Sequence, residues 1–180
     1  LYWFCANKLK VNTAKTQFII FSKKGMAQRI TNDHACITFG GLNIPSQSEV
    51  LYLGVIVDNH LSFQSHINSV CKIISKQLGI LSHIKHLLPF SIRNQVYSAF
   101  VLPHINYCSS IWSCCSHTNL NRIHMLLNRA CRSILNIKDK REHIQPMYDE
   151  LKWLTCFQRF ELNFAIDTYK IIHGFYTIPV

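Results

Sequence analysis

Positive charge without opposing carboxylates is the feature of this sequence that most directly suggests a chemistry. No Asp or Glu lies between Asp58 and Asp139, whereas the cations of that stretch are Lys72, Lys76, Lys85, Arg93, Arg122, Arg129, Arg132 and Lys138. A long stretch of one sign indicates a partner of the opposite sign. The stretch has helical periodicity, so we expect its charge to lie on folded helices. Such charge is typical of proteins that bind the phosphate backbone of nucleic acids.

Motifs for independent catalysis are absent from the sequence. Polymerases transfer phosphoryl groups with two metal ions that paired carboxylates hold, but Asp33 and Glu49 are scattered and Asp149-Glu150 is typical of a helix surface. The sequence also has no P-loop, no G-x-S-x-G and no H-E-x-x-H motif. It begins with Leu1, and we interpret it as a fragment. We therefore expect these residues, taken alone, not to extend a primer.

The eight cysteines and ten histidines form no metal-binding motif. There is no C-x-x-C pair, and His83 with His86, one helical turn apart, lacks a third ligand. Every apolar run is interrupted by Lys, Arg, His or Asn, so neither a membrane span nor a signal peptide is predicted. We therefore expect reduced thiols and an intracellular location, either cytoplasmic or nuclear.

The overall composition is that of a folded, basic protein. Hydrophobic residues make up 48% and charged residues 16% of the 180 residues, and 19 Lys and Arg against 9 Asp and Glu give a formal net charge of +10. A chain of this length buries about two-thirds of its unfolded surface in one core. Nucleic acid is the favoured acidic partner, and an anionic membrane surface is the second.

Short strands are expected in the first sixty residues. Thr16–Ser22 is rich in β-branched and aromatic residues and predicts a strand buried on both faces. Gly40-Gly41 between two apolar runs predicts a tight hairpin. Pro45–Gln47 predicts a loop, and Val50–Val57 predicts one further strand. Together these patterns predict a small antiparallel sheet that follows the end of a helix.

From Ser62 onward the apolar residues recur at helical spacing. They stand three or four positions apart at Phe63, Ile67, Val70, Ile74, Leu78, Leu81, Ile84 and Leu88. Ser62 predicts the start of this helix and Pro89 its end. Further helices are predicted after the possible caps Ser91 and Thr118.

A last helix is predicted to carry Phe157, Phe160, Phe164 and Ile171 on its buried side and to end at Gly174, with a turn around Pro146 before it. Tyr107 and Trp112 are predicted to be core residues. The expected fold class is α+β, with the sheet in residues 1–60 and a helical bundle in residues 61–180.

The order of several short motifs resembles the end of the palm and the thumb of a reverse transcriptase from non-LTR (LINE-type, jockey-like) retrotransposons. Trp3, Cys5, Asn7, Leu9, Asn12, Lys15 and Thr16 are similar to the region that the family calls motif D. Tyr52-Leu53-Gly54 is similar to motif E, and the start of the thumb is matched by Leu61, Phe63, His66 and Ile67. Later matches, in chain order, are Tyr97, Pro103, Tyr107, Trp112, Leu151, Trp153, Leu154, Arg159, Tyr169, Lys170, Ile171 and Gly174.

This resemblance implies a role for each segment. Residues 1–60 would end the palm, and residues 61–180 would form the helical thumb and the segment after it. Lys15 would lie near the incoming nucleotide, where it stabilises or protonates the leaving pyrophosphate. Tyr52, Leu53 and Gly54 would form the primer grip. The residues that would contact the backbone of the RNA template and DNA primer are Lys72, Lys76, Arg122, Arg129 and Arg132.

The resemblance also implies what lies outside this sequence. Mg²⁺ and deoxynucleotides would belong to the complete RNA-directed DNA polymerase, because the family's catalytic aspartates lie on an earlier palm hairpin.

Structural interpretations stand beside these functional ones. Lys15 is also typical of a solvated turn lysine, Gly54 of a glycine at a sheet edge, and Leu53, Val55 and Val57 of core residues. For the whole chain, the alternatives are a non-catalytic nucleic-acid-binding helical module or remnant of a decayed element, and a helical protein-interaction domain whose basic face meets an acidic partner.

Overall fold

The computed structural model describes residues 2–12, 15–23, 36–39, 41–139 and 141–175. The chain divides into two compact units, Leu1–His66 and Ile67–Val180. Strands dominate the described part of the first unit and helices that of the second, so the fold class is α+β, as predicted. Gly40 and most of the connection before the first hairpin lie outside the described residues.

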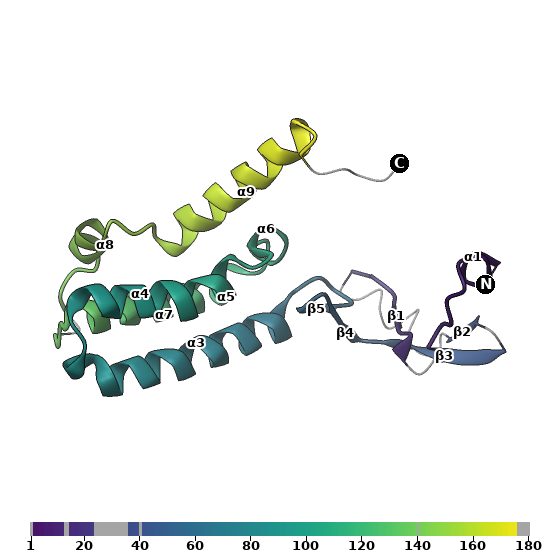
Figure 1. Cartoon of the computed structure of the whole chain (residues 1–180), viewed down its shortest axis with the longest axis horizontal. Coiled ribbons are helices and arrows are strands. Elements are labelled where there is room, and N and C mark those ends of the chain that lie inside the picture. The colour runs from purple at the N-terminus through teal and green to yellow at the C-terminus, as the bar shows by residue number, and fades with distance from the viewer. Residues whose placement is uncertain (1, 13–14, 24–35, 40, 140, 176–180) are drawn as a thin grey trace. The chain divides into compact units, whose positions relative to one another are not determined.

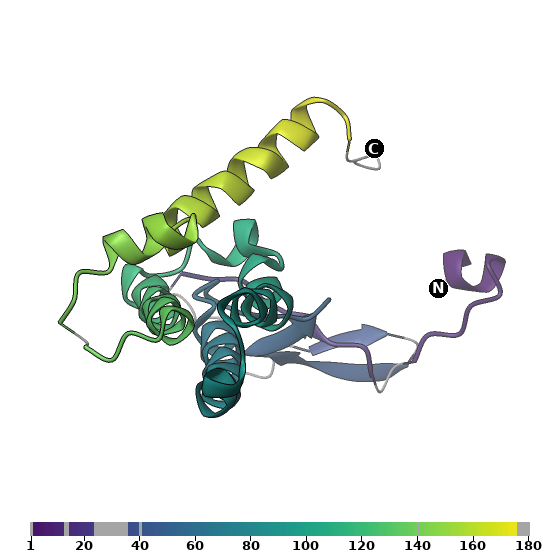
Figure 2. The ribbon, with the colours of Figure 1, turned by 60° about the vertical axis from the view of Figure 1, so that its left-hand side comes forward.

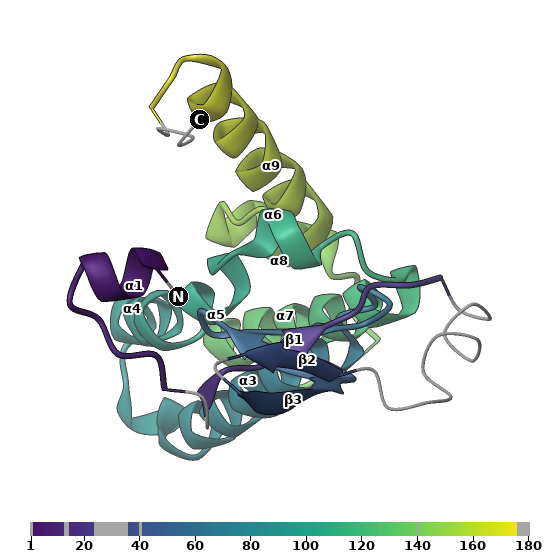
Figure 3. The ribbon, with the colours of Figure 1, turned by 90° about the vertical axis from the view of Figure 1, so that its right-hand side faces the viewer.

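The first unit contains a small sheet of mixed direction. Helix α1 (Tyr2–Ala6) precedes β1 (Phe18–Ile19), and the sheet has the order β1-β3-β2, with β2 at Cys36–Phe39 and β3 at Leu42–Gln47 (Figure 3). β2 and β3 form the predicted hairpin. However, β1 runs parallel to β3, so the prediction of an antiparallel sheet was wrong for this pair. No short turn joins β1 to β3, and the local sequence therefore does not determine their relative direction.

Two further expectations for this sheet were wrong. β3 continues through Pro45–Gln47, where a loop was predicted, and Ser46 and Gln47 pair with β1. Neither residue of β1 is fully buried, whereas a strand buried on both faces was predicted.

β4 (Glu49–Tyr52) and β5 (Val55–Asp58) form a separate antiparallel hairpin. The single strand predicted over Val50–Val57 was therefore wrong, because the chain reverses at Leu53 and Gly54, which have φ of +46° and +83°. Positive φ at both turn positions is characteristic of two-residue hairpin turns, but leucine rarely adopts it. Because leucine is not typical of such a turn, the sequence pattern did not predict it. Leu53 is 72% exposed and is not a core residue, whereas Val55 is buried as expected.

One carboxylate organises the chain between β5 and the first long helix. Asp58 accepts hydrogen bonds from the backbone N–H groups of His60, Ser62 and Phe63 at 3.0, 3.1 and 2.7 Å, and from the Ser62 hydroxyl at 3.1 Å. Partial burial favours the neutral acid, but these donors together hold the pKa of Asp58 below its usual value. Ser62, the predicted cap, accepts a longer bond of 3.4 Å from the N–H of Gln64.

The second unit is a helical bundle. Its elements are α3 (Gln64–Ile84, which begins at the end of the first unit), η2 (Lys85–Leu87), α4 (Phe90–Phe100), α5 (Leu102–Asn106), α6 (Ser109–Trp112), α7 (His117–Leu135), α8 (Gln145–Leu151) and α9 (Cys156–Ile172). The helices α3, α4 and α7 run alongside one another in Figure 1, and Figure 2 shows them nearly end-on with α9 crossing above. The predicted apolar stripe of α3 is confirmed for its buried members Ile67, Val70, Ile74, Leu78 and Leu81, whereas Ile84 is exposed.

Several helix starts differ from the sequence prediction. α4 follows Pro89, and Ser91 lies inside the helix without capping it. Ser116 rather than Thr118 caps α7, since its side chain accepts a hydrogen bond from the N–H of Asn119. Pro146 lies in the first turn of α8 rather than in a loop. Proline fits a first helical turn, because the N–H that it lacks would have no intrahelical partner there.

The last helix buries only part of the side predicted to face inward. Phe160 is buried and meets Trp112 edge-to-face with ring centroids 5.1 Å apart, so both are core residues. Phe164, Ile171 and Tyr107 are more than half exposed, and their predicted burial was wrong. Gly174 follows α9 with φ of +69°, which is the conformation expected of a glycine at this position.

We predict that Asp58→Ala lowers the free energy of unfolding by about 1–2 kcal/mol near pH 7, because it removes the acceptor of three backbone N–H groups between β5 and α3. The folded-state pKa of Asp58 is depressed, so its contribution is present above the unfolded-state pKa and is lost as the pH falls through the folded-state pKa. Urea unfolding at several pH values measures this difference.

Glu49→Gln is the matched control for this substitution. Glu49 is exposed and lies opposite Asp58 in the same hairpin. An equal effect of both substitutions, or a loss from Asp58→Ala that persists in strong acid, would contradict the role of the Asp58 carboxylate in holding the loop before α3.

Candidate nucleic-acid interface

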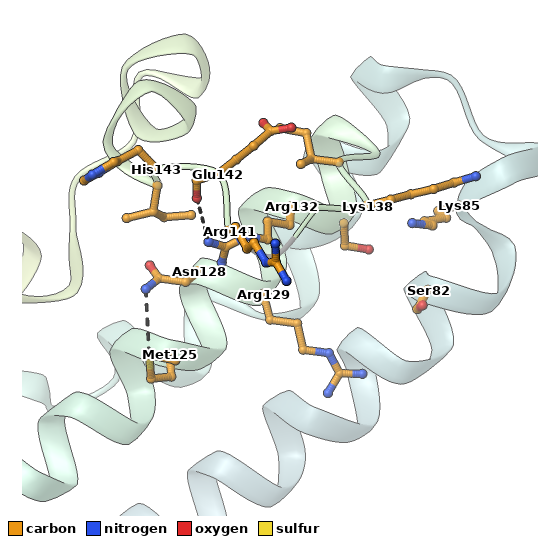
Figure 4. Close-up of a pocket in the computed structure, with 13 residues that line it drawn as sticks. Ser82, Lys85, Met125, Asn128, Arg129, Arg132, Lys138, Arg141, Glu142 and His143 are labelled. Carbon is orange, nitrogen blue, oxygen red and sulfur yellow. Dashed lines mark hydrogen bonds between the residues drawn. The ribbon is translucent and has the colours of Figure 1, made fainter.

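A cavity of about 720 Å³ opens between α3, α7 and the segment that joins α7 to α8. Among the described residues, the cations that line it are Lys85 directly after α3, Arg129 and Arg132 on α7, and Lys138 and Arg141 on the joining segment. Figure 4 shows these side chains around the cavity, with Arg132 and Arg141 close together and the guanidinium group of Arg129 extending away from them. An anion in the cavity would therefore meet positive charge from several directions.

The amphipathic pattern of α7 determines where its arginines point. Its apolar residues Ile123, Leu127, Ala130 and Ile134 are fully buried. Arg122 and Arg129 stand seven residues apart, which is about two helical turns, so they share another side of the helix. Burial of the apolar side thus directs this arginine side away from the core.

The segment after α7 folds back over the end of that helix. Asn136 ends α7 with φ of +59°, and the N–H of Ile137 donates to the carbonyl of Arg132 at 2.9 Å. Nη2 of Arg132 donates to the backbone oxygen of Glu142 at 3.1 Å. These contacts place Lys138 and Arg141 at the cavity that Arg129 borders.

A buried hydrogen bond joins α7 to α8 at the same cavity. The hydroxyl of Tyr148 donates to Oδ1 of Asn128 at 2.9 Å, and both residues are buried. Burial raises the pKa of Tyr148 far above its usual value, so its phenol stays protonated and remains a donor. Asn128 also lines the cavity, so this bond supports its wall.

The field in the cavity is strongly positive. Glu142 supplies the one carboxylate among the lining residues that the structure describes, and in Figure 4 its side chain points away from Arg129 and Arg132. His124 on α7 adds no charge near neutral pH, because burial lowers its pKa. Lining cations that outnumber the carboxylates concentrate anions locally.

The structure separates the five predicted backbone-binding residues into three sites. Arg129 and Arg132 line the cavity. Arg122 lines an adjoining hollow with Cys71 and Ser75, and it donates to Oδ1 of Asn68 at 2.7 Å. Met125 borders both hollows, so they form one continuous surface.

Lys72 and Lys76 are exposed on α3 and line neither hollow. They follow Cys71 and Ser75 by one position, which turns the helix by about 100°. They therefore form a separate ridge on the outward side of α3.

Sequence reasoning did not propose three of the cavity cations as site residues. Lys85 interrupts an apolar pattern, and this interruption was a usable signal. Lys138 is the last cation of the carboxylate-free stretch, and it lies after the helix with Asp139 directly beside it. Arg141 lies among the acids Asp139 and Glu142, and the folding back of the segment was needed to reveal it.

The proposed primer-grip residues form the tip of the β4–β5 hairpin in the first unit. Tyr52 and Leu53 are 68% and 72% exposed, and Gly54 completes the turn. An exposed apolar tip on a turn that holds leucine at positive φ is an unusual combination, because it lowers stability without filling a core.

Lys15 is exposed and lies just before β1. Its N–H donates to the carbonyl of Asn12 at 3.1 Å, and the Thr16 hydroxyl donates to the same oxygen at 2.9 Å. These bonds hold the backbone of Lys15 and the side chain of Thr16 to Asn12, while the Lys15 side chain is exposed.

Among the residues that the structure describes, no group of three or more His, Cys, Asp or Glu side chains could hold a metal ion. All eight cysteines are free thiols, and burial raises the pKa of Cys131 and Cys156 to about 12. Within the same ranges, no helix has the length and apolar character needed to cross a membrane.

We predict that Tyr148→Phe lowers the free energy of unfolding by about 1–3 kcal/mol, because it leaves the Asn128 carbonyl unsatisfied in the interior. Thermal or urea unfolding measures the change. Tyr169→Phe is the control, since Tyr169 is 57% exposed and loses the same hydroxyl. Equal stability of the two variants would show that the Asn128–Tyr148 bond does not support the fold.

Two known proteins are similar in sequence to this chain. The chain is 33% identical over 129 residues, 70% of its length, to "Probable RNA-directed DNA polymerase from transposon BS" of Drosophila melanogaster. It is 23% identical over 135 residues, 73% of its length, to "RNA-directed DNA polymerase from mobile element jockey" of Drosophila funebris. The chain spans 14% of the length of each relative. No family model and no solved structure matches it. The two similarities support a place for this chain in the reverse transcriptase family.

Proposed function

We propose that this chain is part of the RNA-directed DNA polymerase of a non-LTR retrotransposon and that it holds the RNA template and DNA primer. The observation that carries the proposal is that Lys85 of η2, Arg129 and Arg132 of α7, and Lys138 and Arg141 of the joining segment line one cavity. Similarity to two polymerases of mobile elements supports it. Contacts from Lys and Arg to phosphates provide affinity and position without reading the base sequence, which suits a polymerase that copies any template.

The two units have separate parts in this proposal. Residues 1–60 end the palm, and residues 61–180 form the thumb and the helical segment after it. The lysine ridge of Lys72 and Lys76 and the arginine side of α7 face the phosphates. Exposure of Lys72, Lys76, Arg122 and Arg129 supports this assignment, because an exposed cation reaches a ligand without rearrangement of the core.

The hairpin tip at Tyr52, Leu53 and Gly54 acts as the primer grip. Its support is chemical: the ring of Tyr52 and the side chain of Leu53 are exposed, apolar surfaces of the kind that packs against sugars or bases, and Gly54 permits close approach of a strand. Strain at Leu53 is consistent with a residue kept for contact rather than for stability.

Lys15 acts on the incoming deoxynucleotide. A cation near the leaving pyrophosphate stabilises charge that develops during the reaction, and an ammonium group can also donate a proton. In this proposal Mg²⁺ is held by carboxylates in another part of the longer polymerase, and residues of this chain bind and orient the nucleic acid.

We predict that replacing Lys72, Lys76, Arg129 and Lys138 with Gln flattens the salt dependence of binding to a template–primer with a single-stranded overhang. Each lost phosphate contact lowers the slope of log K against log salt by about 0.7–0.9, so the slope should fall by roughly 3. Fluorescence anisotropy between 50 and 300 mM salt measures it.

The control removes the same number of charges at Lys8, Lys10, Lys23 and Lys152, all of which are exposed and lie outside the cavity. If both variants change the slope equally, binding reflects net charge alone. If wild-type binding shows no salt dependence, the nucleic-acid function itself is refuted.

We predict that Lys15→Ala in the complete polymerase lowers kcat by roughly 10- to 1,000-fold and changes template–primer affinity little, since the cation acts mainly in the transition state. Lys15→Arg keeps the charge but cannot readily release a proton. Rescue by arginine would assign an electrostatic role, and failure of rescue would assign proton donation. Single-turnover incorporation measures both, and a rate near wild type for Lys15→Ala would contradict any role in the chemical step.

A further inference from the structure

The shape of the cationic cavity differs from the shape that a duplex requires. Duplex phosphates lie on a convex surface, and the exposed ridge of Lys72 and Lys76 can meet them from one side. The cavity instead presents Lys85, Arg129 and Arg141 from three parts of the chain. A duplex keeps its bases stacked and paired, so only a single strand can place a phosphate among these cations and an unstacked base against the cavity wall.

The cavity has the size and the lining of a nucleotide site. Its volume of about 720 Å³ lies within the roughly 300–1,000 Å³ of cavities that enclose small-molecule-sized ligands. Beside the cations it has apolar wall residues, Met125, Ile137 and Ile144, and the imidazole of His143. Single-stranded nucleic acids are bound by this combination of positive charge with apolar or ring surfaces for unstacked bases.

We propose that this cavity binds one nucleotide of a single-stranded nucleic acid, with Lys138 and Arg141 at its phosphate and Met125 against its base. The proposal rests on the proposed function and deepens it: the cavity holds unpaired template, and the α3 ridge holds the duplex. Contact between the base and Met125 is apolar, so it does not select a sequence.

Two variants of equal charge separate the cavity from the ridge. Lys138→Gln/Arg141→Gln and Lys72→Gln/Lys76→Gln each remove two exposed cations, and neither pair includes a buried residue. The probes are a labelled single-stranded 12-mer of uridylate and a blunt 12-base-pair RNA–DNA duplex, each titrated with the 180-residue chain. We expect the cavity variant to bind the single strand roughly 10-fold or more weakly and the duplex less than about 3-fold more weakly, with the opposite pattern for the ridge variant.

A third variant tests the contact with the base. Met125 is 60% exposed, so Met125→Ala leaves the core intact. It should weaken binding of the uridylate strand by roughly 3- to 10-fold and leave an abasic ribose-phosphate strand of equal length unchanged. Equal weakening of the two strands would overturn the assignment of Met125 to the base.

The outcomes distinguish this inference from the function on which it rests. If the cavity variant weakens both probes equally, or neither, the single-strand site is refuted while salt-dependent duplex binding still supports the proposed function. If uridine monophosphate displaces the 12-mer at equal concentration, the cavity binds free nucleotide rather than a strand. If the wild-type chain binds neither probe, both proposals fail.

Discussion

The packed apolar side of α7 is the constraint on which the charged surface depends. Ile123, Leu127, Ala130 and Ile134 are fully buried, and each large apolar side chain contributes about 1.5–3 kcal/mol when it is removed from water. Rotation of α7 would expose these residues, so the helix has one stable orientation. The side of the helix from which each arginine projects is therefore fixed before any ligand arrives. Such preorganisation of the backbone lowers the entropic cost of binding.

Two polar contacts extend this order beyond the helix. Arg132 holds the backbone of Glu142, and Tyr148 holds Asn128 from α8. Both bonds draw the joining segment against α7, so Lys138 and Arg141 come close to Arg129 although like charges repel. The repulsion is tolerated because these cations are at least partly exposed to water, where the dielectric constant is high and salt screens them. An anion that displaces this water would relieve the repulsion and gain several charge-assisted contacts.

The first unit places its candidate site residues on tight backbone turns rather than on a packed helix. Asp58 gathers the donors that follow β5, and Asn12 organises the turn at Lys15. The β4–β5 tip keeps Leu53 at positive φ and in solvent. Turns of this kind hold the backbone while leaving side chains accessible, which is the condition for contact with a ligand. The second unit thus exposes its cations from a packed helix, and the first unit exposes its candidate side chains from tight turns.

The sequence by itself determined the fold class, the helical periodicity and the sign of the surface. These features follow from local spacing and composition: the buried members of α3 and α7 appear every three or four residues, and the absence of acids between Asp58 and Asp139 needs no structure to recognise. The hairpin with a glycine pair was predictable for the same reason, whereas the turn at Leu53 was hidden because its residue type does not indicate positive φ. The starts of α4 and α7 were not predicted correctly, because Pro89 and Ser116 precede these helices in place of Ser91 and Thr118. Which of several neighbouring residues caps a helix depends on backbone geometry.

Only the tertiary structure decided which cations line the same cavity. Arg129 and Arg132 share the cavity with Lys85, Lys138 and Arg141, whereas Lys72 and Lys76 lie on a separate ridge. Sequence distance does not predict this grouping, because it depends on the packing of α7 near α3 and on the return of the chain after Asn136. The parallel pairing of β1 with β3 is also a long-range contact, without a short turn to specify it. Local patterns thus determined the elements and their charges, and long-range packing determined the site.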